Sequence, residues 1–211
     1  MLRVSEIFHS LQGESSRVGL PTVFIRLTGC PLRCVWCDTE HAFSGGQNLS
    51  QDEILHQVAA YRCATICVTG GEPLAQREAP ALLAALCDAG YSVSLETSGA
   101  LDIGEVDPRM VRVVDLKPPG SGEASRNRWD NIDLLRPQDE LKFVLASRED
   151  YDWAVSACRQ HRLFERCSVL FAPVQDVLDP ATLAQWLLDD RLPARFQLQL
   201  HKLLWGNARG R

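Results

Sequence analysis

Three cysteines stand within eight residues near the start of the chain, as Cys30, Cys34 and Cys37 in the pattern C-x3-C-x2-C. Iron–sulfur clusters are normally held by cysteine thiolates, so three thiolates on one loop predict a 4Fe–4S cluster whose fourth iron is open to a small molecule. An open iron indicates chemistry rather than electron storage. A zinc ion with His41 as fourth ligand is the alternative metal site, although zinc ribbons usually carry two C-x2-C pairs. The alternative without a metal is three unrelated buried cysteines.

The other five cysteines are predicted to be buried thiols: Cys63, Cys67, Cys87, Cys158 and Cys167. Cys63 and Cys67 form a second C-x3-C pair, but the residues around Cys67 are too apolar to present a pair of ligands. Free cysteine is among the most buried residue types in proteins. A cytosolic chain keeps its thiols reduced, so disulfides are not expected.

The composition limits the partners of the chain. It has 211 residues and a net charge of −5. This length fits one domain over residues 1–211, with a flexible tail from about residue 206. The acidic balance argues against nucleic acid as a partner, because a phosphate-binding groove needs clustered Lys and Arg. No apolar run reaches the roughly 20 residues that span a bilayer, and no signal peptide opens the chain, so we expect a cytoplasmic protein with no membrane partner.

The scaffold that must position these cysteines consists of apolar, β-branched runs that alternate with helical patterns. Strands are predicted at residues 22–28, 64–69, 91–96, 112–116, 141–145, 168–171 and 195–200, and helices at 51–61, 80–89, 149–160 and 180–189. Ser50 and Glu53 predict a capping box at the first helix, and Gly90 predicts a cap after the second. This alternation implies βα units and a mostly parallel sheet. We therefore expect an α/β fold, namely a shortened, partly open (β/α) barrel with about six parallel strands and reduced helices.

Polar motifs follow four of the predicted strands. The cysteine loop follows the first, Gly70–Glu72 the second, Thr97–Gly99 the third and Lys117 the fourth. Ligands of parallel sheets bind beyond the carboxyl ends of the strands, so these motifs are expected to converge there. The stretch at 118–130 is polar and rich in Gly and Pro, and it is predicted to be a long functional loop.

The cysteine loop, together with Thr69–Pro73 (TGGEP), resembles the radical S-adenosylmethionine superfamily. A closer resemblance, over nearly the whole chain, is to the 7-carboxy-7-deazaguanine synthase family. It is carried by five segments: Glu6–Glu14 (EIFHSLQGE), Phe24–Cys30 (FIRLTGC), Cys37–Thr39 (CDT), Glu96–Gly99 (ETSG) and Leu198–Lys202 (LQLHK). The barrel expected above would then be of the radical S-adenosylmethionine type.

The resemblance implies a lyase that acts on 6-carboxy-5,6,7,8-tetrahydropterin. In this family a 5′-deoxyadenosyl radical removes hydrogen from C6, the ring contracts, ammonia leaves, and 7-carboxy-7-deazaguanine is formed for queuosine and 7-deazapurine biosynthesis. The implied cofactors are a 4Fe–4S cluster, S-adenosylmethionine used catalytically, and Mg²⁺. The implied partners are the small-molecule substrate, an electron donor such as flavodoxin or ferredoxin, and a second copy of the chain in a homodimer.

The resemblance also implies a role for individual residues. Substrate contacts fall on Leu11, Gln12, Gly13, Glu14, Arg26 and Thr69. Contacts with S-adenosylmethionine fall on Trp36, Cys37, Asp38, Gly70, Gly71, Glu72, Ser98 and Lys117. The Mg²⁺ contact falls on Thr39.

The residue types suit these roles. Gln12 and Glu14 can read the edge of a pterin through paired hydrogen bonds, and Arg26 can bind its carboxylate through two parallel hydrogen bonds. Thr39 offers a neutral oxygen to Mg²⁺, a cation that prefers oxygen ligands. The structural alternatives are a turn cap for Gln12 and Glu14, an ion pair for Arg26, a helix N-cap for Thr39 and a surface position for Lys117.

The C-terminal motif ends in His201 and Lys202, for which a strand end with solvated side chains is the alternative. In some relatives the chain stops soon after this motif and its carboxylate reaches the substrate, whereas this chain continues for nine residues. Two other functions stay open: an activase that makes a glycyl radical on a protein partner, and a non-catalytic module that binds zinc or an iron–sulfur cluster. The Leu-Gln-Gly-Glu segment and Arg26 favour the small pterin.

Overall fold

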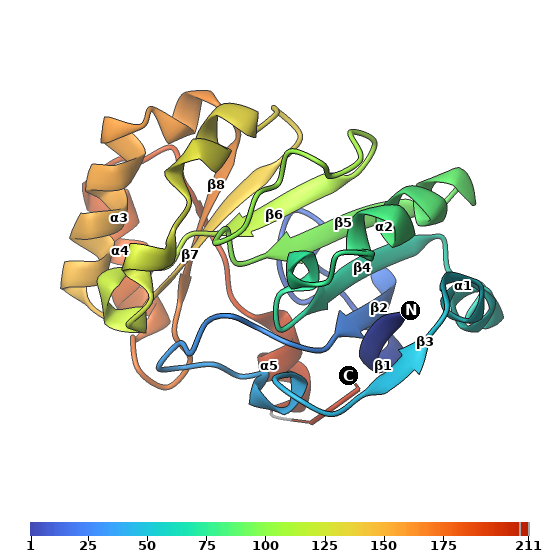
Figure 1. Ribbon diagram of the computed structural model, residues 1–211. Helices are drawn as coiled ribbons and strands as arrows, with labels where there is room; N and C mark the ends of the chain where they lie inside the picture. The colour runs from blue at the N-terminus through green and yellow to red at the C-terminus, as the bar shows by residue number, and fades with distance from the viewer. Residues whose placement is uncertain (207, 211) are drawn as a thin grey trace.

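One curved sheet runs through the computed structural model, which describes residues 1–206 and 208–210 (Figure 1). In this part of the chain nine strands pair in the order β3-β1-β2-β4-β5-β6-β7-β8-β9. Their bounds are β1 Leu2–Leu11, β2 Pro21–Leu27, β3 Gln47–Leu49, β4 Thr65–Gly70, β5 Ser92–Thr97, β6 Val111–Asp115, β7 Glu140–Leu145, β8 Ser168–Pro173 and β9 Arg195–Phe196. The first and last strands in this order do not pair with each other, so the barrel is open.

Seven of these strands are parallel, from β2 through β4 to β9. The other two extend the sheet at the β2 side, where β1 runs antiparallel to β2 and β3 runs antiparallel to β1. The predicted α/β fold with a partly open parallel barrel is therefore confirmed. The antiparallel extension was not predicted, because Glu6, His9 and Ser10 interrupt the apolar pattern of β1.

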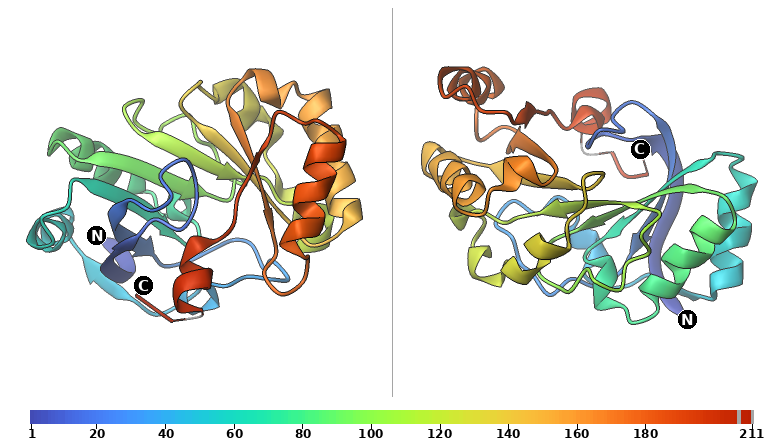
Figure 2. Two further views of the ribbon diagram at one scale, coloured as in Figure 1. Left: turned by 180° about the vertical axis from the view of Figure 1, so that it is seen from behind. Right: turned by 90° about the horizontal axis from the view of Figure 1, so that it is seen from above.

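The helices are α1 Gln51–Ala60, α2 Ala79–Asp88, α3 Arg148–Gln160, α4 Pro180–Asp189 and α5 Leu200–Trp205. The first four lie along the outer side of the sheet, and α5 lies beside the segment that follows β1 (Figure 2). The connections from β5 to β6 and from β6 to β7 contain no α-helix, and the second holds only 3-10 turns. The reduced helix content expected from the sequence is confirmed.

Local signals act as predicted at two helix ends. The Ser50 side chain accepts the backbone N–H of Glu53, and the Glu53 side chain accepts the N–H of Ser50, which completes a capping box. Gly90 follows α2 with a φ of +85°, in the left-handed region that ends many helices. These caps fix where each helix leaves the sheet edge.

The two faces of the sheet differ in chemistry, because side chains alternate along a strand. The outer face is apolar and packs against α1 to α4, with Ile25, Val68 and Phe143 fully buried in that core. The inner face carries polar side chains such as Glu96 and Lys142, which line a cavity. The core therefore lies between sheet and helices, and the inner face is left for ligands.

The last predicted strand, 195–200, is wrong over most of its length. Only Arg195–Phe196 pairs with β8, and Leu200 begins α5. The chain leaves the sheet because Gln197 donates a side-chain hydrogen bond to the Ser15 carbonyl, and Leu200 N–H donates to the Gly13 carbonyl. These bonds tie the C-terminal segment to the loop after β1.

Three smaller predictions have separate outcomes. Burial is confirmed for Cys67 and Cys158, whereas Cys63, Cys87 and Cys167 are only half-buried against the core. The tail expected from about residue 206 includes 207 and 211, which lie outside the described residues. Among residues 1–206 and 208–210, no helix is long and apolar enough to cross a membrane.

Candidate active site

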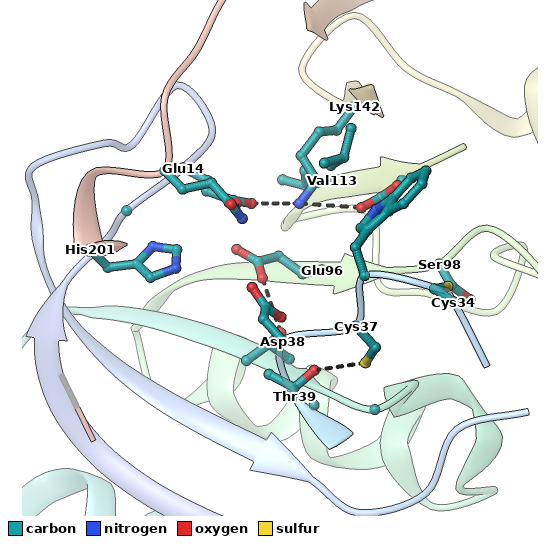
Figure 3. Close-up of a pocket in the computed structure, with 18 of the residues that line it drawn as sticks. Glu14, Cys34, Cys37, Asp38, Thr39, Glu96, Ser98, Val113, Lys142 and His201 are labelled. Carbon is teal, nitrogen blue, oxygen red and sulfur yellow. Dashed lines mark hydrogen bonds and ion pairs between the residues drawn. The ribbon is translucent and has the colours of Figure 1, made fainter. Parts of the chain in front are cut away.

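A cavity of about 360 Å³ opens at the carboxyl ends of β2, β4, β5, β6 and β7 (Figure 3). The cysteine loop after β2 closes one side, and the segment after β1 and α5 close the other. This volume is within the range of small-molecule sites. The parallel strands thus bring distant segments of the chain to one point, as the sequence predicted.

The cysteine loop lines this cavity with all three of its thiols, those of Cys30, Cys34 and Cys37. The backbone is held by a turn in which Cys37 N–H donates to the Cys34 carbonyl at 3.2 Å, and by Val35 N–H donating to the Ser121 carbonyl at 3.0 Å. Burial raises the pKa of the Cys30 and Cys34 thiols. Binding a cluster as thiolates must therefore displace protons from these groups.

The three thiols of the cysteine loop have the donor chemistry of a cluster site. In residues 1–206 and 208–210, no three His, Cys, Asp or Glu side chains gather closely enough to hold one metal ion. A zinc ion needs its ligands about 2.0–2.3 Å from one point. His41, the fourth ligand of the zinc alternative, instead lies 3.4 Å from Glu6. A cubane offers a separate iron to each of three thiolates, which is the donor set of Cys30, Cys34 and Cys37.

The two glycines after β4 allow close backbone packing against the cysteine loop. Gly70 has a φ of +151°, and a Cβ there would lie 2.2 Å from the Leu27 carbonyl oxygen. A Cβ on Gly71 would lie 2.3 Å from the Gly29 carbonyl oxygen and 2.9 Å from Cβ of Cys30. Only glycine fits at these contacts. The glycine turn therefore fixes the position at which the cysteine loop starts.

Glu72 is not among the residues that line the cavity, and its contact with S-adenosylmethionine stays a prediction. It is fully buried, and its carboxylate accepts hydrogen bonds from the Thr97 hydroxyl at 2.9 Å and from the N–H and hydroxyl of Ser98 at 2.7 and 2.5 Å. Leu74 N–H adds a further bond at 3.0 Å. A buried carboxylate is stable only when it is paired in this way. In the structure, Glu72 fixes Ser98, which does line the cavity.

On the opposite side of the cavity, the loop after β1 brings Gln12 and Glu14 inward. The Gln12 amide accepts from Glu14 N–H at 3.2 Å and donates to Glu96 at 3.2 Å. Glu96 also accepts from the Thr69 hydroxyl at 3.0 Å. Gln12 therefore holds the loop and Glu96 in place, and the carboxylates of Glu14 and Glu96 are the groups that remain to accept from a ligand.

Glu14 is held by two donors. Lys142 contacts one oxygen at 2.5 Å, and the Gln199 amide donates to the other at 2.5 Å. Burial raises the pKa of Glu14, but the charge and hydrogen bond of Lys142 and the hydrogen bond of Gln199 outweigh it and lower the pKa to about 2. Glu14 is thus an ionised acceptor on the cavity wall.

Arg26 lies at the carboxyl end of β2 and lines the cavity beside the ring of Phe8. Its Nε donates to Glu6 at 2.7 Å. Among the described residues, its two terminal amino groups have no hydrogen-bond partner. An ion pair at Nε therefore orients the guanidinium and leaves its fork for a carboxylate.

Lys142 lines the cavity, although the sequence does not predict it as a site residue. Its ammonium contacts Glu14 and also Asp115 at 3.3 Å, and Asp115 in turn contacts Lys117 at 3.1 Å. The carboxylates of Glu14 and Asp115 outweigh the effect of burial and raise the pKa of Lys142 well above its ordinary value. A lysine within the apolar run of β7 was the signal in the sequence.

The rim of the cavity is formed by α5 and the end of the cysteine loop. Lys202 contacts Asp38 at 2.9 Å, and His201 packs against Gly13, where an added Cβ would lie 2.1 Å from the imidazole Nδ1. Thr39 precedes a 3-10 turn but makes no capping hydrogen bond, and its hydroxyl lies 3.8 Å from the Cys37 sulfur.

Apart from Glu72, every predicted site residue lines this cavity. The set is Leu11, Gln12, Gly13, Glu14, Arg26, Cys30, Cys34, Trp36, Cys37, Asp38, Thr39, Thr69, Gly70, Gly71, Ser98 and Lys117. Their roles toward a ligand remain predictions.

Known proteins are similar to this chain in sequence. Residues 24–115 match the model of the family described as Radical SAM superfamily. A 7-carboxy-7-deazaguanine synthase of Chlorobaculum tepidum is 46% identical over 99% of this chain and 97% of its own. Proteins of the same name from Koribacter versatilis and Thermoplasma acidophilum are 42% and 35% identical to this chain, and each alignment covers at least 97% of both chains.

Solved structures share the fold. QueE from Escherichia coli superposes with a TM-score of 0.78 at 21% identity, over 95% of this chain and 94% of that one. Streptococcus suis SuiB gives a TM-score of 0.56 at 16% identity, over 81% of this chain and 47% of the other. At these identities the likeness concerns the fold alone.

Proposed function

Because the chain belongs to the 7-carboxy-7-deazaguanine synthase family of radical S-adenosylmethionine enzymes, we propose that its cavity converts 6-carboxy-5,6,7,8-tetrahydropterin to 7-carboxy-7-deazaguanine with release of ammonia. The chain is a lyase whose cofactors are a 4Fe–4S cluster and S-adenosylmethionine. The full-length similarity favours this function over the glycyl-radical activase and over a non-catalytic module.

The observation that carries the proposal is that one cavity joins the cysteine loop to the inner polar face of the sheet. Cys30, Cys34 and Cys37 line one side, and Glu14 and Arg26 line the other. A radical formed beside the cluster would therefore meet a ligand held by those two side chains. Fixed positions of the reacting groups are the main contribution a protein makes to cofactor chemistry.

Arg26 and Glu14 suit two different parts of the substrate. Arg26 presents the fork of its guanidinium, which pairs with a carboxylate through two hydrogen bonds. Glu14 is acceptor-only, so it pairs with N–H donors on the ring edge of a pterin. Glu96 offers a second carboxylate beside it, held by Thr69 and Gln12.

When bound, the cluster and S-adenosylmethionine supply the 5′-deoxyadenosyl radical that removes hydrogen from C6 of the pterin. Cys30, Cys34 and Cys37 would hold the cluster by their thiolates. The glycine turn at Gly70 and Gly71 lets backbone approach the cofactor without side-chain clash, and the Ser98 hydroxyl and the Lys117 ammonium lie in the same wall. Lys117 is only partly exposed and is paired with Asp115. This pairing fixes its position and does not fit the surface alternative.

Magnesium fits one residue of this chain. The hydroxyl of Thr39 has no capping bond, and its nearest polar neighbour is the Cys37 sulfur at 3.8 Å. Mg²⁺ keeps several waters and takes few protein ligands, so one hydroxyl beside a carboxylated substrate suits it. We assign to Thr39 the protein's contact with Mg²⁺.

Three further features of the proposal concern the whole molecule. The reaction needs a one-electron donor of the flavodoxin or ferredoxin kind, the working state is a homodimer, and the enzyme acts in the cytoplasm. They are supported by the family and by the need of a 4Fe–4S cluster for an external electron.

An anaerobic assay tests the function. The cluster is reconstituted, S-adenosylmethionine, a strong reductant, Mg²⁺ and carboxytetrahydropterin are added, and product is followed by the absorbance of the deazaguanine ring. Product is expected from the wild type and from Cys87→Ala, whose thiol lies on α2 outside the cavity. Cys34→Ala is expected to form neither product nor deoxyadenosine. Deoxyadenosine without product in the wild type would contradict the substrate, and cleavage by Cys34→Ala would contradict the cluster site.

A further inference from the structure

A chain of polar contacts crosses the cavity from the C-terminal segment to the cofactor side. The Gln199 amide donates to Glu14 at 2.5 Å, and Glu14 contacts Lys142 at 2.5 Å. Lys142 reaches Asp115 at 3.3 Å, and Asp115 contacts Lys117 at 3.1 Å. The five side chains come from four separate segments of the chain, so most of these contacts exist only in the folded protein.

Lys142 is the central member of this chain and is largely shielded from water. Its side chain is 10% exposed, and those of Glu14 and Asp115 are 9% and 14% exposed. Two carboxylates in one shielded cavity oppose each other's ionisation unless a cation lies between them. The Lys142 ammonium occupies that position. Together with Gln199 it binds both oxygens of Glu14, which fixes the orientation of that carboxylate.

We propose that Lys142 is a positioning residue that keeps Glu14 as a fixed, ionised acceptor, and that it thereby sets the selectivity for a ring edge with two adjacent N–H donors. The inference rests on the proposed function and deepens it, since it names the part of the substrate that the wall reads. An ionised carboxylate accepts two such hydrogen bonds, whereas a protonated one presents a donor to the ring and loses the match.

The charges around Glu14 show what removal of Lys142 would do. Glu14 is influenced by the charges of Lys142 on β7, His201 on α5 and Asp38 on the cysteine loop, and Lys142 in turn faces Asp115 on β6 and Glu96 on β5. Without Lys142, the carboxylate of Asp38 still opposes the charge on Glu14, Lys202 is paired with Asp38, and burial still disfavours the charge. The pKa of Glu14 would then rise from about 2 to above its ordinary value of 4.5.

The sign of the pH effect follows. In Lys142→Met, Glu14 is protonated at low pH and the substrate is bound weakly, and binding recovers as rising pH ionises the carboxyl group. In the wild type Glu14 is ionised throughout. The ratio of kcat/KM in the variant to that in the wild type removes any titration that the two share, including that of the substrate.

The test measures this ratio with reconstituted holoenzyme over about pH 6 to 9, where a buried carboxyl without a cation titrates. At the acidic end of this range, we expect the kcat/KM of Lys142→Met to be at least about 30-fold below that of the wild type. This is the usual loss when one partner of a buried charged hydrogen bond is removed. The ratio should rise by about 10-fold with pH. Lys142→Met combined with Glu14→Gln should show no such rise. A flat ratio in the single variant, or an equal rise in the double variant, would overturn the inference.

Two additions keep the result clear. Lys142→Gln keeps a donor without the charge, and should show the same rise with a smaller loss, so a failure of Lys142→Met to fold leaves the test in place. A pterin analogue whose exocyclic amine is replaced by hydrogen should be rejected by the wild type. The preference for the pterin over this analogue, as a ratio of kcat/KM values, should be about 10-fold smaller in the Lys142 variants. An unchanged preference would overturn the selectivity claim. Wild type that forms no product would refute the proposed function and the inference together, whereas an active wild type with a flat ratio refutes the inference alone.

Discussion

Gly71 is the point at which the glycine turn touches the cysteine loop, and alanine there tests whether that contact places the cluster ligands. The new methyl group would lie 2.3 Å from the Gly29 carbonyl oxygen and 2.9 Å from Cβ of Cys30. Ordinary contact needs about 3.5 Å, so the start of the loop must move by roughly 1 Å. Overpacking of this kind costs about 1–3 kcal/mol of unfolding free energy. A 1 Å misplacement at a reaction centre lowers the rate about 100-fold.

We therefore expect Gly71→Ala to reduce iron and sulfide content after anaerobic reconstitution, and to slow reductive cleavage of S-adenosylmethionine by about 10- to 100-fold. Gly90→Ala is the matched control. Gly90 has a φ of +85° and nothing within 4 Å of an added Cβ, so it loses about 1–2 kcal/mol through backbone strain alone. Urea unfolding of both metal-free variants shows whether their stabilities match. Equal cluster content and cleavage in the two variants would refute the reasoning.

Four further predictions follow from other contacts. Arg26→Lys replaces the guanidinium fork by a point charge, so KM for the pterin should rise about 10-fold or more in steady-state kinetics, and an unchanged KM would contradict the carboxylate clamp. Thr39→Val should raise the Mg²⁺ concentration needed for half-maximal product formation, and an unaltered Mg²⁺ titration would remove Thr39 from the metal site. The pKa of Glu14 in the folded protein is about 2 against an ordinary 4.5, so its ionisation stabilises the protein above about pH 4.5, and that contribution disappears as pH falls toward 2. The difference in free energy of unfolding between wild type and Glu14→Gln, measured with urea, should therefore shrink on acidification. A constant difference would contradict the depressed pKa. Arg112→Met leaves the carboxylate of Asp139, which is 0% exposed, without its cation, so the free energy of unfolding should fall by about 3–5 kcal/mol. Most of this loss should be recovered in the double variant Arg112→Met/Asp139→Leu. No recovery in the double variant would show that packing rather than charge is lost.

Much of the scaffold could be predicted because the parallel strands are buried against the helices and can be recognised in the sequence as apolar runs. The segments around Ile25, Val68 and Phe143 all became strands, and the Ser50 capping box began the first helix as expected. The strand β1 could not be predicted because Glu6, His9 and Ser10 interrupt its apolar pattern. The sequence predicts a strand through residue 200 in the C-terminal segment, since nothing local shows that Gln197 binds the loop after β1.

The candidate site was predictable where a motif is contiguous, as in the cysteine loop and the glycine turn. It was not predictable where a contact joins distant segments. Glu14 and Lys142 are separated by 128 positions, and the sequence of β7 does not show that Lys142 meets a residue so far away in the chain. Glu72 shows the reverse case, because the motif gives its residue type but not the direction of its side chain, which Thr97 and Ser98 determine.

The central claim is that this cavity presents C6 of a carboxylated tetrahydropterin to the radical formed beside Cys30, Cys34 and Cys37. The most direct measurement uses substrate deuterated at C6 and mass spectrometry of the 5′-deoxyadenosyl group after turnover. We predict that deuterium enters this group and that unlabelled substrate gives none. Formation of 7-carboxy-7-deazaguanine with no deuterium in the 5′-deoxyadenosyl group would contradict the account.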